Sequence, residues 1–433
     1  MNSKRMMRWL IVLFLLAVLP AMTAVVAQGQ EPVGKQLPVV TEPGESQAPE
    51  TWDYYESESN NTKGTADSIQ LGYVMGGKID YPGDIDYFKI DPRYETEVYL
   101  LDIEAQSIGS ALDSVICMGD DIQPYKWECN DDTDTLDSLL FANPLDSQTY
   151  IKVTDYGDYH GGDDHYYELI LAMPLLISAA PGGLGTGNVA GIPFQSGDVL
   201  AWSDLVNQTD KWVLFFDASD VGVKTLSNLS IGGTNALLFS VGASQTLPGL
   251  GTITAYDIVR FAATRIGPRT EGSFSMHLRG STINLTTSSE KLDALESNFW
   301  SWDAFYMAVS TTGVATGDYK LDDEDLLILE IWFGEPDWNW NSYSFDINGV
   351  NDGSNPHTVA GLPAEDVIGF AFRPDSGPMY MTILGSGKIA GHRVTQKDIF
   401  SLDYPSYTWG GVAWHGPDHD WNYNIDAFDS GKW

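Results

Sequence analysis

The amino-acid sequence predicts an all-β protein: a β-sandwich followed by a β-repeat domain. Between residues 51 and 174, short runs with alternating apolar and polar positions, such as 98–103 and 150–153, are separated by Gly, Asp and Pro clusters. About eight such runs in this length are typical of a β-sandwich. After residue 190, an Asp followed by two apolar residues recurs at Asp198, Asp257, Asp325 and Asp398, which indicates a structural repeat.

Each repeat unit is expected to hold four strands within roughly 70 residues. In one unit these are 292–295, 304–310, 325–327 and 343–347. Glu, Lys, Leu and Ala at 289–296 favour helix, but the repeat predicts a strand there.

The two ends of the repeat domain look like partial units. The domain opens with only the last portion of a unit, 198–202, and closes with what reads as a first portion, 408–428. Two partial units that complete each other predict a closed, propeller-like ring of about four units, because closure leaves no unpaired edge strand. A stacked double sandwich is the alternative architecture.

The N-terminal residues predict export. Lys4, Arg5 and Arg8 precede an apolar run at 9–19, and small residues lead to Ala27. The run is shorter than the roughly 20 residues that a membrane span needs, so a cleaved signal peptide is favoured over an uncleaved anchor. We therefore expect a secreted protein, extracellular or at the cell surface, without membrane insertion. The expected domains are a signal peptide (1–27), a disordered linker (28–50), the sandwich (51–174), a Gly-rich linker (175–190) and the repeat domain (191–433).

The charge is strongly acidic. The chain carries a formal net charge of −37, and removing residues 1–27 takes away three positive charges and no negative one, which gives −40. Such a chain repels nucleic acid and anionic lipid, so neither is an expected partner. Cations are favoured, calcium above all, because carboxylates are hard oxygen ligands. Solubility alone, in a salty habitat, is the other explanation for these charges.

Two cysteines, Cys117 and Cys129, flank a turn-like stretch between two β-prone runs. A hairpin folded about Gln123 would set them opposite each other, and an exported protein can oxidise them. We predict a disulfide, with two free buried thiols as the alternative.

A calcium site is predicted from the oxygen-bearing side chains near the start of the sandwich. Alternate residues of an extended segment share one face, so Glu56, Glu58 and Asn60 can converge, with Asn61 beside them. Asp84 and Asp86, from a tight Gly-containing loop, can complete the ligand set. An acidic surface strand without an ion is the alternative reading.

Residues 52–173 resemble the bacterial pre-peptidase C-terminal (PPC) domain. The resemblance lies in the runs 56–61 (ESESNN), 66–69 (ADSI), 76–79 (GGKI), 83–88 (GDIDYF), 109–114 (GSALDS), 137–140 (DSLL) and 150–153 (YIKV). It implies a jelly-roll-like sandwich that binds calcium at the positions given above. Asn61 departs from the pattern, which often has Asp there, and the loss of that charge should weaken ion binding. The family accompanies secreted peptidases and other exported enzymes, and a related module in clostridial collagenases binds collagen and calcium. The repeat domain has no firm resemblance to a family.

Other patterns in the sequence have ordinary structural explanations. The run 375–378 (DSGP) is similar to the nucleophile segment of trypsin-like proteases, but turn chemistry explains it. His415 and His419 could share a metal only on a helix, which Gly416 and Pro417 oppose. The acidic residues of 131–137 lack the Gly and distal Glu of an EF-hand and read as a solvated loop.

A pair of tryptophans suggests a weak ligand site. Trp338 and Trp340 alternate, so both indoles share one strand face, which is either a platform for sugar or aromatic groups or ordinary core. No catalytic residue is predicted. The sequence thus favours a secreted, non-catalytic binding or adhesion protein with calcium as cofactor and an extracellular polysaccharide or protein as ligand. A secreted hydrolase or a peptidase-associated accessory protein is the alternative, and a purely structural cell-surface component is a third possibility.

Overall fold

The computed structural model describes most of the chain after residue 51, with gaps. Described are residues 52–90, 98–120, 127–131, 135–142, 149–179, 186–206, 210–233, 235–283, 285–287, 290–297, 304–309, 314–316, 319–321, 326–331, 338–346, 355–356, 366–371, 378–403, 406 and 408–430, with backbone only at 304–356. These residues form strands and short 3-10 turns, and none of them lies in an α-helix. The described part also contains no helix long and apolar enough to cross a membrane.

The first ten strands form two five-stranded sheets, ordered β1-β3-β10-β5-β8 and β2-β4-β9-β6-β7. Their bounds are β1 (Tyr54–Tyr55), β2 (Asp67–Ser68), β3 (Val74–Lys78), β4 (Asp86–Ile90), β5 (Tyr99–Glu104), β6 (Ser114–Asp120), β7 (Glu128–Asn130), β8 (Leu139–Ala142), β9 (Thr149–Asp155) and β10 (Tyr166–Ala172). The alternation in β4 buries Phe88 and Ile90, which belong to one apolar cluster with Leu101 of β5 and Leu169 of β10. This cluster joins side chains from the two sheets, as in a sandwich.

The predicted disulfide is confirmed. Cys117 of β6 lies opposite Cys129 of β7 in the antiparallel register, and their sulfur atoms are bonded. The turn of this hairpin, 121–126, lies outside the described residues.

The described residues after 174 form four larger sheets and four two-stranded hairpins. The strands are β11 (Leu175–Ala179), β12 (Thr186–Val189), β13 (Ile192–Gln195), β14 (Val199–Ser203), β15 (Lys211–Phe216), β16 (Leu226–Ile231), β17 (Ala236–Val241), β18 (Gln245–Leu247), β19 (Gly251–Ile253), β20 (Ile258–Arg265), β21 (Glu271–Leu278), β22 (Leu292–Ser297), β23 (Ala304–Val309), β24 (Val314–Thr316), β25 (Tyr319–Leu321), β26 (Leu326–Ile331), β27 (Trp338–Asp346), β28 (Asn355–Pro356), β29 (Val367–Ala371), β30 (Met379–Ile383), β31 (Ser386–Ile389), β32 (His392–Thr395), β33 (Asp398–Asp403), β34 (Thr408–His415) and β35 (Ile425–Ser430). The large sheets are ordered β15-β14-β11-β35, β16-β17-β20-β21, β22-β23-β26-β27-β28 and β29-β30-β33-β34.

The repeat is visible in this order. In three of the large sheets, the first four strands follow one another along the chain. Between the second and the third strand of each sheet, the chain forms a separate two-stranded hairpin: β18-β19, β24-β25 or β31-β32. The strand at 292–297, where local propensity favours helix, is β22, as the repeat predicts. The hairpins are a feature that the sequence analysis missed. In β31-β32, Ala390 and Gly391 both take positive φ, 49° and 87°, as a two-residue hairpin turn requires.

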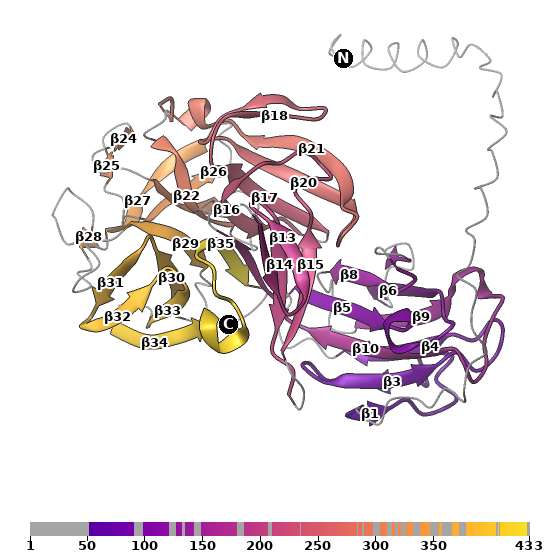
Figure 1. Ribbon diagram of the computed structural model, residues 1–433. Coiled ribbons are helices and arrows are strands. Elements are labelled where there is room, and N and C mark those ends of the chain that lie inside the picture. The colour runs from indigo at the N-terminus through magenta and orange to yellow at the C-terminus, as the bar shows by residue number, and fades with distance from the viewer. Residues whose placement is uncertain are drawn as a thin grey trace, which may run out of the picture. The chain divides into compact units, whose positions relative to one another are not determined.

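The first sheet is completed by the C-terminal strand. Ile177 of β11 pairs with Leu200 of β14 on one side and with Phe428 of β35 on the other. Residues 198–202 and 425–428 therefore share one sheet, as predicted, and Figure 1 shows β35, in yellow, beside the magenta strands that begin the repeat region. The four first strands also contact one another: β16 lies against β22 and β35, and β29 lies against the same two strands.

Two details of the predicted boundaries differ. Residues 175–190, expected as a Gly-rich linker, contribute β11 and β12, because the apolar run 175–179 pairs with strands on both sides. Residues 408–415 do not begin a new unit. They form β34, the fourth strand of the last sheet, and only β35 belongs to the next one.

The recurring Asp of the repeat has a structural role. One carboxylate oxygen accepts a backbone N–H three residues earlier: Gln195 to Asp198 at 2.6 Å, Thr254 to Asp257 at 2.9 Å and Thr395 to Asp398 at 2.7 Å. The other carboxylate oxygen is hydrogen-bonded to a residue at the end of the fourth strand or just beyond it. The partners are the N–H of Ala218 for Asp198, the N–H of Gly280 for Asp257 and the His415 ring for Asp398. Each Asp thus ties the turn before the third strand to the end of the fourth. Asp325 lies outside the described residues.

Candidate metal centre

The candidate site lies where one segment crosses between the two sheets of the sandwich. The N–H of Glu56 donates to Gly76 of β3 at 3.0 Å, and the N–H of Tyr87 in β4 donates to the carbonyl of Asn60 at 3.2 Å. Residues 56–60 are thereby held against a strand of each sheet. Gly83, with φ of 86°, makes the turn that brings Asp84 and Asp86 to the same place.

Five carboxylates meet there in two overlapping groups. Oxygen atoms of Glu56, Glu58 and Asp86 lie within 4.8 Å of one another, and so do those of Glu58, Asp80 and Asp84. Glu58 belongs to both groups. We call the five side chains together with Asn60 the carboxylate cluster.

The hydrogen bonds of Asp84 separate its role from that of Asp86. Asp84 accepts the backbone N–H of Asp80 at 2.8 Å and of Ile85 at 3.1 Å, and also the side-chain amide of Asn61. Its oxygens are therefore already used to shape the loop.

Two oxygens of the first group point to a ligand. Asp86 accepts a hydrogen bond from the Tyr167 hydroxyl at 2.6 Å through Oδ2, whereas its Oδ1 has no partner among the described residues. The amide nitrogen of Asn60 donates to Glu56 at 3.0 Å, and Asn60 Oδ1 likewise has no partner. Both residues have no exposed surface, and buried oxygens without a donor are costly unless a cation or water meets them.

The electrostatics of the carboxylate cluster also favour a cation. Burial raises the pKa of Asp86, and the neighbouring Glu56 raises it further. Burial likewise raises the pKa of Glu56 and of Glu58, and Asp84 and Asp80 add to the rise at Glu58. Lys78 pairs with Asp80 at 2.6 Å and with the exposed Asp163 at 3.2 Å. A divalent cation would stabilise the ionised carboxylates that burial and mutual repulsion oppose.

All six metal ligands that the sequence suggested lie in this region. Glu56, Glu58 and Asp86 come together directly, and Asn60 adjoins them through its amide N–H, which donates to Glu56. Asn61 instead turns its amide N–H groups toward Tyr81 and Asp84. Asp80 was not among the predicted ligands, although its position two residues beyond β3 could have indicated it.

The other candidate motifs do not form comparable groups where they are described. His415 pairs with Asp398, and His419 pairs with Asp210 at 2.6 Å, so each histidine has its own carboxylate. Asp137 accepts the backbone N–H groups of Ala105 at 2.9 Å and Gln106 at 2.6 Å, which is a structural role. Residues 375–377 and 132–134, and the side chains of Trp338 and Trp340, lie outside the described part.

Comparison with known proteins adds little. No family model matches the chain, and no curated protein matches it. Among solved structures, the pre-peptidase C-terminal domain of a collagenase from Bacillus anthracis is similar to part of the chain, with 11% identity and a TM-score of 0.21. The match covers 24% of this chain and 93% of that one. At this TM-score the likeness supports nothing about the site or the activity.

Proposed function

We propose that this protein is an exported, non-catalytic binding protein. Its sandwich is a PPC domain that binds calcium, and its repeat region is a closed ring of four sheets that presents the ligand-binding surface. The proposal depends on two buried oxygens of the carboxylate cluster, Asn60 Oδ1 and Asp86 Oδ1, which have no hydrogen-bond partner within the part of the chain that the structure describes.

Calcium suits this cluster for chemical reasons. It takes six to eight oxygen ligands in a flexible geometry, and carboxylates with an amide oxygen are its usual protein ligands. Glu56, Glu58, Asn60 and Asp86 would hold the ion, while Asp84 and Asn61 shape the neighbouring loop. The ion would stabilise the charges at the junction of the two sheets and so fix the sandwich.

Ring closure is supported by the pairing at the ends of the repeat region. The C-terminal strand β35 completes the sheet of β11, and the four first strands contact each other in a cycle. A closed ring holds loops from several sheets rigidly in one place, which suits recognition of an extracellular ligand.

The test is thermal unfolding of the chain from residue 28 onward, with calcium and with a chelator. Calcium should raise the melting temperature, since ligand in hundredfold excess over its Kd contributes about 2.7 kcal/mol. Glu58→Gln should abolish the effect. Asp163→Asn, which removes a fully exposed carboxylate beside Lys78, should keep it. Equal melting temperatures for the unmodified chain in calcium and in chelator would refute the calcium site.

Binding is tested separately. The same protein is screened against glycans and extracellular matrix proteins, with peptidase and glycosidase assays in parallel. Saturable binding without turnover supports the proposal. Turnover of a peptide or glycan by the purified chain would replace it with a hydrolase.

A further inference from the structure

The sandwich and the repeat region meet at one face of β5. Leu101 belongs to the core of the sandwich, whereas Leu100 belongs to an apolar cluster that includes residues of β15. Because alternate residues of a strand share one face, Asp102 and Glu104 lie on the same side as Leu100. Both carboxylates contact Lys211, the first residue of β15. Lys211 therefore connects the two parts of the chain.

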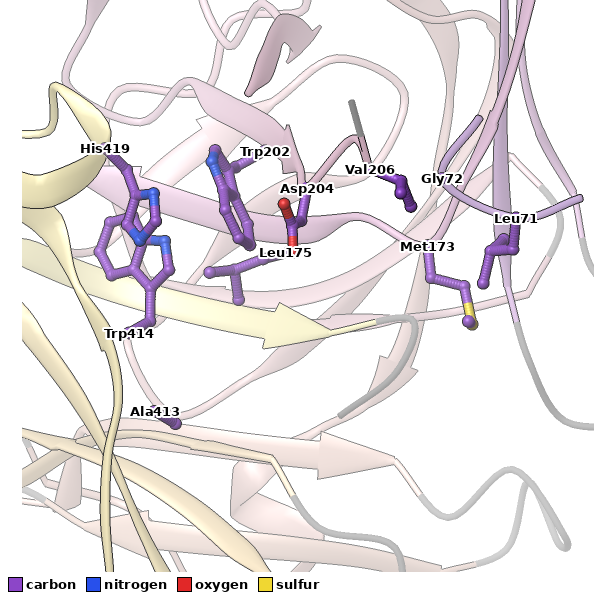
Figure 2. A pocket seen from close by; sticks show the side chains of 10 residues that line it. All are labelled: Leu71, Gly72, Met173, Leu175, Trp202, Asp204, Val206, Ala413, Trp414 and His419. Carbon is purple, nitrogen blue, oxygen red and sulfur yellow. The ribbon is translucent and has the colours of Figure 1, made fainter. Parts of the chain in front are cut away.

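This junction also contains open space. A cavity of about 440 Å³ is lined by Leu71 and Met173 on the side of the sandwich and by Trp202 and Trp414 on the side of the repeat region. Figure 2 shows these two pairs of side chains on opposite sides of the cavity. A covalent bond across the junction would therefore add a constraint that packing at the cavity does not supply.

The three charged side chains at the junction are not equally buried. The Asp102 side chain is 9% exposed, whereas those of Glu104 and Lys211 are 21% and 24% exposed. Lys211 Nζ lies 3.4 Å from Asp102 Oδ2 and also contacts a carboxylate oxygen of Glu104. Even so, Asp102 Oδ2 has no hydrogen-bond partner among the described residues. A buried, ionised carboxylate is costly without hydrogen bonds, so this arrangement does not favour an ionised Asp102.

The electrostatics of the junction also favour a neutral Asp102. Burial raises the pKa of its carboxyl group, the charge of Lys211 opposes the rise, and the charge of Asp137 adds to it. Glu104, which is more exposed, contacts Lys211 Nζ and can accept a proton from it. This proton transfer leaves a neutral amine beside a neutral carboxylic acid, which are the two reactants of amide formation.

We propose that Lys211 and Asp102 form an intramolecular isopeptide bond, with Glu104 as the group that transfers protons. Glu104 takes a proton from the ammonium group, and the lone pair of Nζ attacks Cγ of the protonated Asp102. The new N–C bond replaces the C–OH bond, and the hydroxyl leaves as water with the proton from Glu104. The second amine proton passes through Glu104 to the solvent. The products are one amide, one water and one proton, and no oxidant or further reactant is needed. Contact between the two groups makes the step intramolecular, which favours it over the same reaction in solution.

The test is the intact mass of the chain from residue 28 onward, measured after denaturation and reduction of the disulfide. The unmodified chain should be lighter than its sequence by one water molecule. Lys211→Arg and Glu104→Gln should each have the full mass of their sequences. Lys78→Arg is the matched control, because Lys78 forms an ion pair with Asp80 at 2.6 Å within the sandwich and should keep the deficit.

Trypsin digestion locates the bond. Trypsin does not cleave after a lysine whose amine is in an amide, so the digest should contain a branched peptide that joins residues 94–126 to residues 153–224. The full mass of the unmodified chain, with complete cleavage after Lys211, would overturn the bond and leave an ion pair. A water deficit that persists in Lys211→Arg would also overturn it, because another site would then carry the loss. Neither result bears on calcium or ligand binding, which the thermal test and the binding screen measure.

Discussion

The Tyr167 hydroxyl lies 2.6 Å from Oδ2 of Asp86 and donates a hydrogen bond to it, while Oδ1 of the same carboxylate remains buried without a partner among the described residues. Tyr167 also reaches Glu56 at 3.2 Å. One phenol on β10 thus positions two carboxylates of the cluster and leaves oxygens available for an ion. Acidity, burial and available oxygens at one place are the basis of the predictions on calcium.

The first prediction concerns pH. The folded-state pKa values of Glu56 and Asp86 are raised above the ordinary values of 4.5 and 3.8. At a pH between the ordinary and the raised values, the calcium-free folded chain therefore binds more protons than the unfolded chain. Stability contributed by the protonated groups is present at low pH and is lost as the pH rises through the raised values. Denaturant unfolding in chelator should therefore show stability falling from about pH 5 toward pH 8, and Asp86→Asn should flatten the fall.

The disulfide gives a second prediction. Cys117 and Cys129 close a loop with a sequence separation of 12. Replacing both with Ala should lower the free energy of unfolding by about 2 to 3 kcal/mol, mainly by freeing the unfolded chain. Urea unfolding measures this. The unmodified chain in reductant should lose a similar amount, and a double variant as stable as the oxidised chain would contradict the prediction.

The proposed ring closure gives a third prediction. Deleting residues 424–433 removes β35 and leaves the β11 edge unpaired. Exposed strand edges associate, so we expect oligomers or aggregates in light scattering coupled to gel filtration. Deleting only residues 431–433, after the last strand, should give a monomer like the full chain. A stable, monomeric product of the longer deletion would show that the repeat region does not depend on closure.

The recurring Asp gives a fourth. Asp257 accepts the N–H groups of Thr254 at 2.9 Å and Gly280 at 3.0 Å, and it is 2% exposed. Asp257→Ala leaves both backbone donors without this acceptor, removes the carboxylate that lies 3.4 Å from Arg279, and should cost about 2 to 5 kcal/mol in urea unfolding. Asp257→Asn keeps one acceptor oxygen and should cost less. An alanine variant within 0.5 kcal/mol of the unmodified chain, roughly the range of surface substitutions, would remove the structural role.

Much of the fold could be predicted from local pattern. Alternation in β4 and the recurrence of Asp before paired apolar residues indicated strands and repeats. Successive side chains of a strand point to opposite faces, so a few neighbouring residues suffice to show which face is buried. The shared sheet of 198–202 and 425–428 could also be predicted, since two incomplete units complete one sheet. The disulfide followed from the hairpin that sets Cys117 opposite Cys129.

What the sequence did not predict depends on contacts between distant segments. β11 follows the last strand of the sandwich directly in sequence and precedes a Gly-rich run. Its neighbouring residues therefore give no indication that it pairs with β35. Asp80 joins the carboxylate cluster only because the loop after β3 folds back toward Glu58. The ring contacts of Trp202 with Trp414 and His419 join residues from opposite ends of the repeat region, and they form only once those ends meet.

The most direct measurement is calorimetric titration of calcium into the chelator-treated chain near neutral pH, in two buffers of different ionisation enthalpy. Binding of one ion should release protons, because Glu56 and Asp86 have raised pKa values and must ionise to bind it. We expect saturable binding with proton release that is lost in Glu58→Gln and kept in Asp163→Asn. The calcium site would be contradicted if neither buffer showed binding heat and no calcium were retained on dialysis. It would also be contradicted if both variants bound calcium equally.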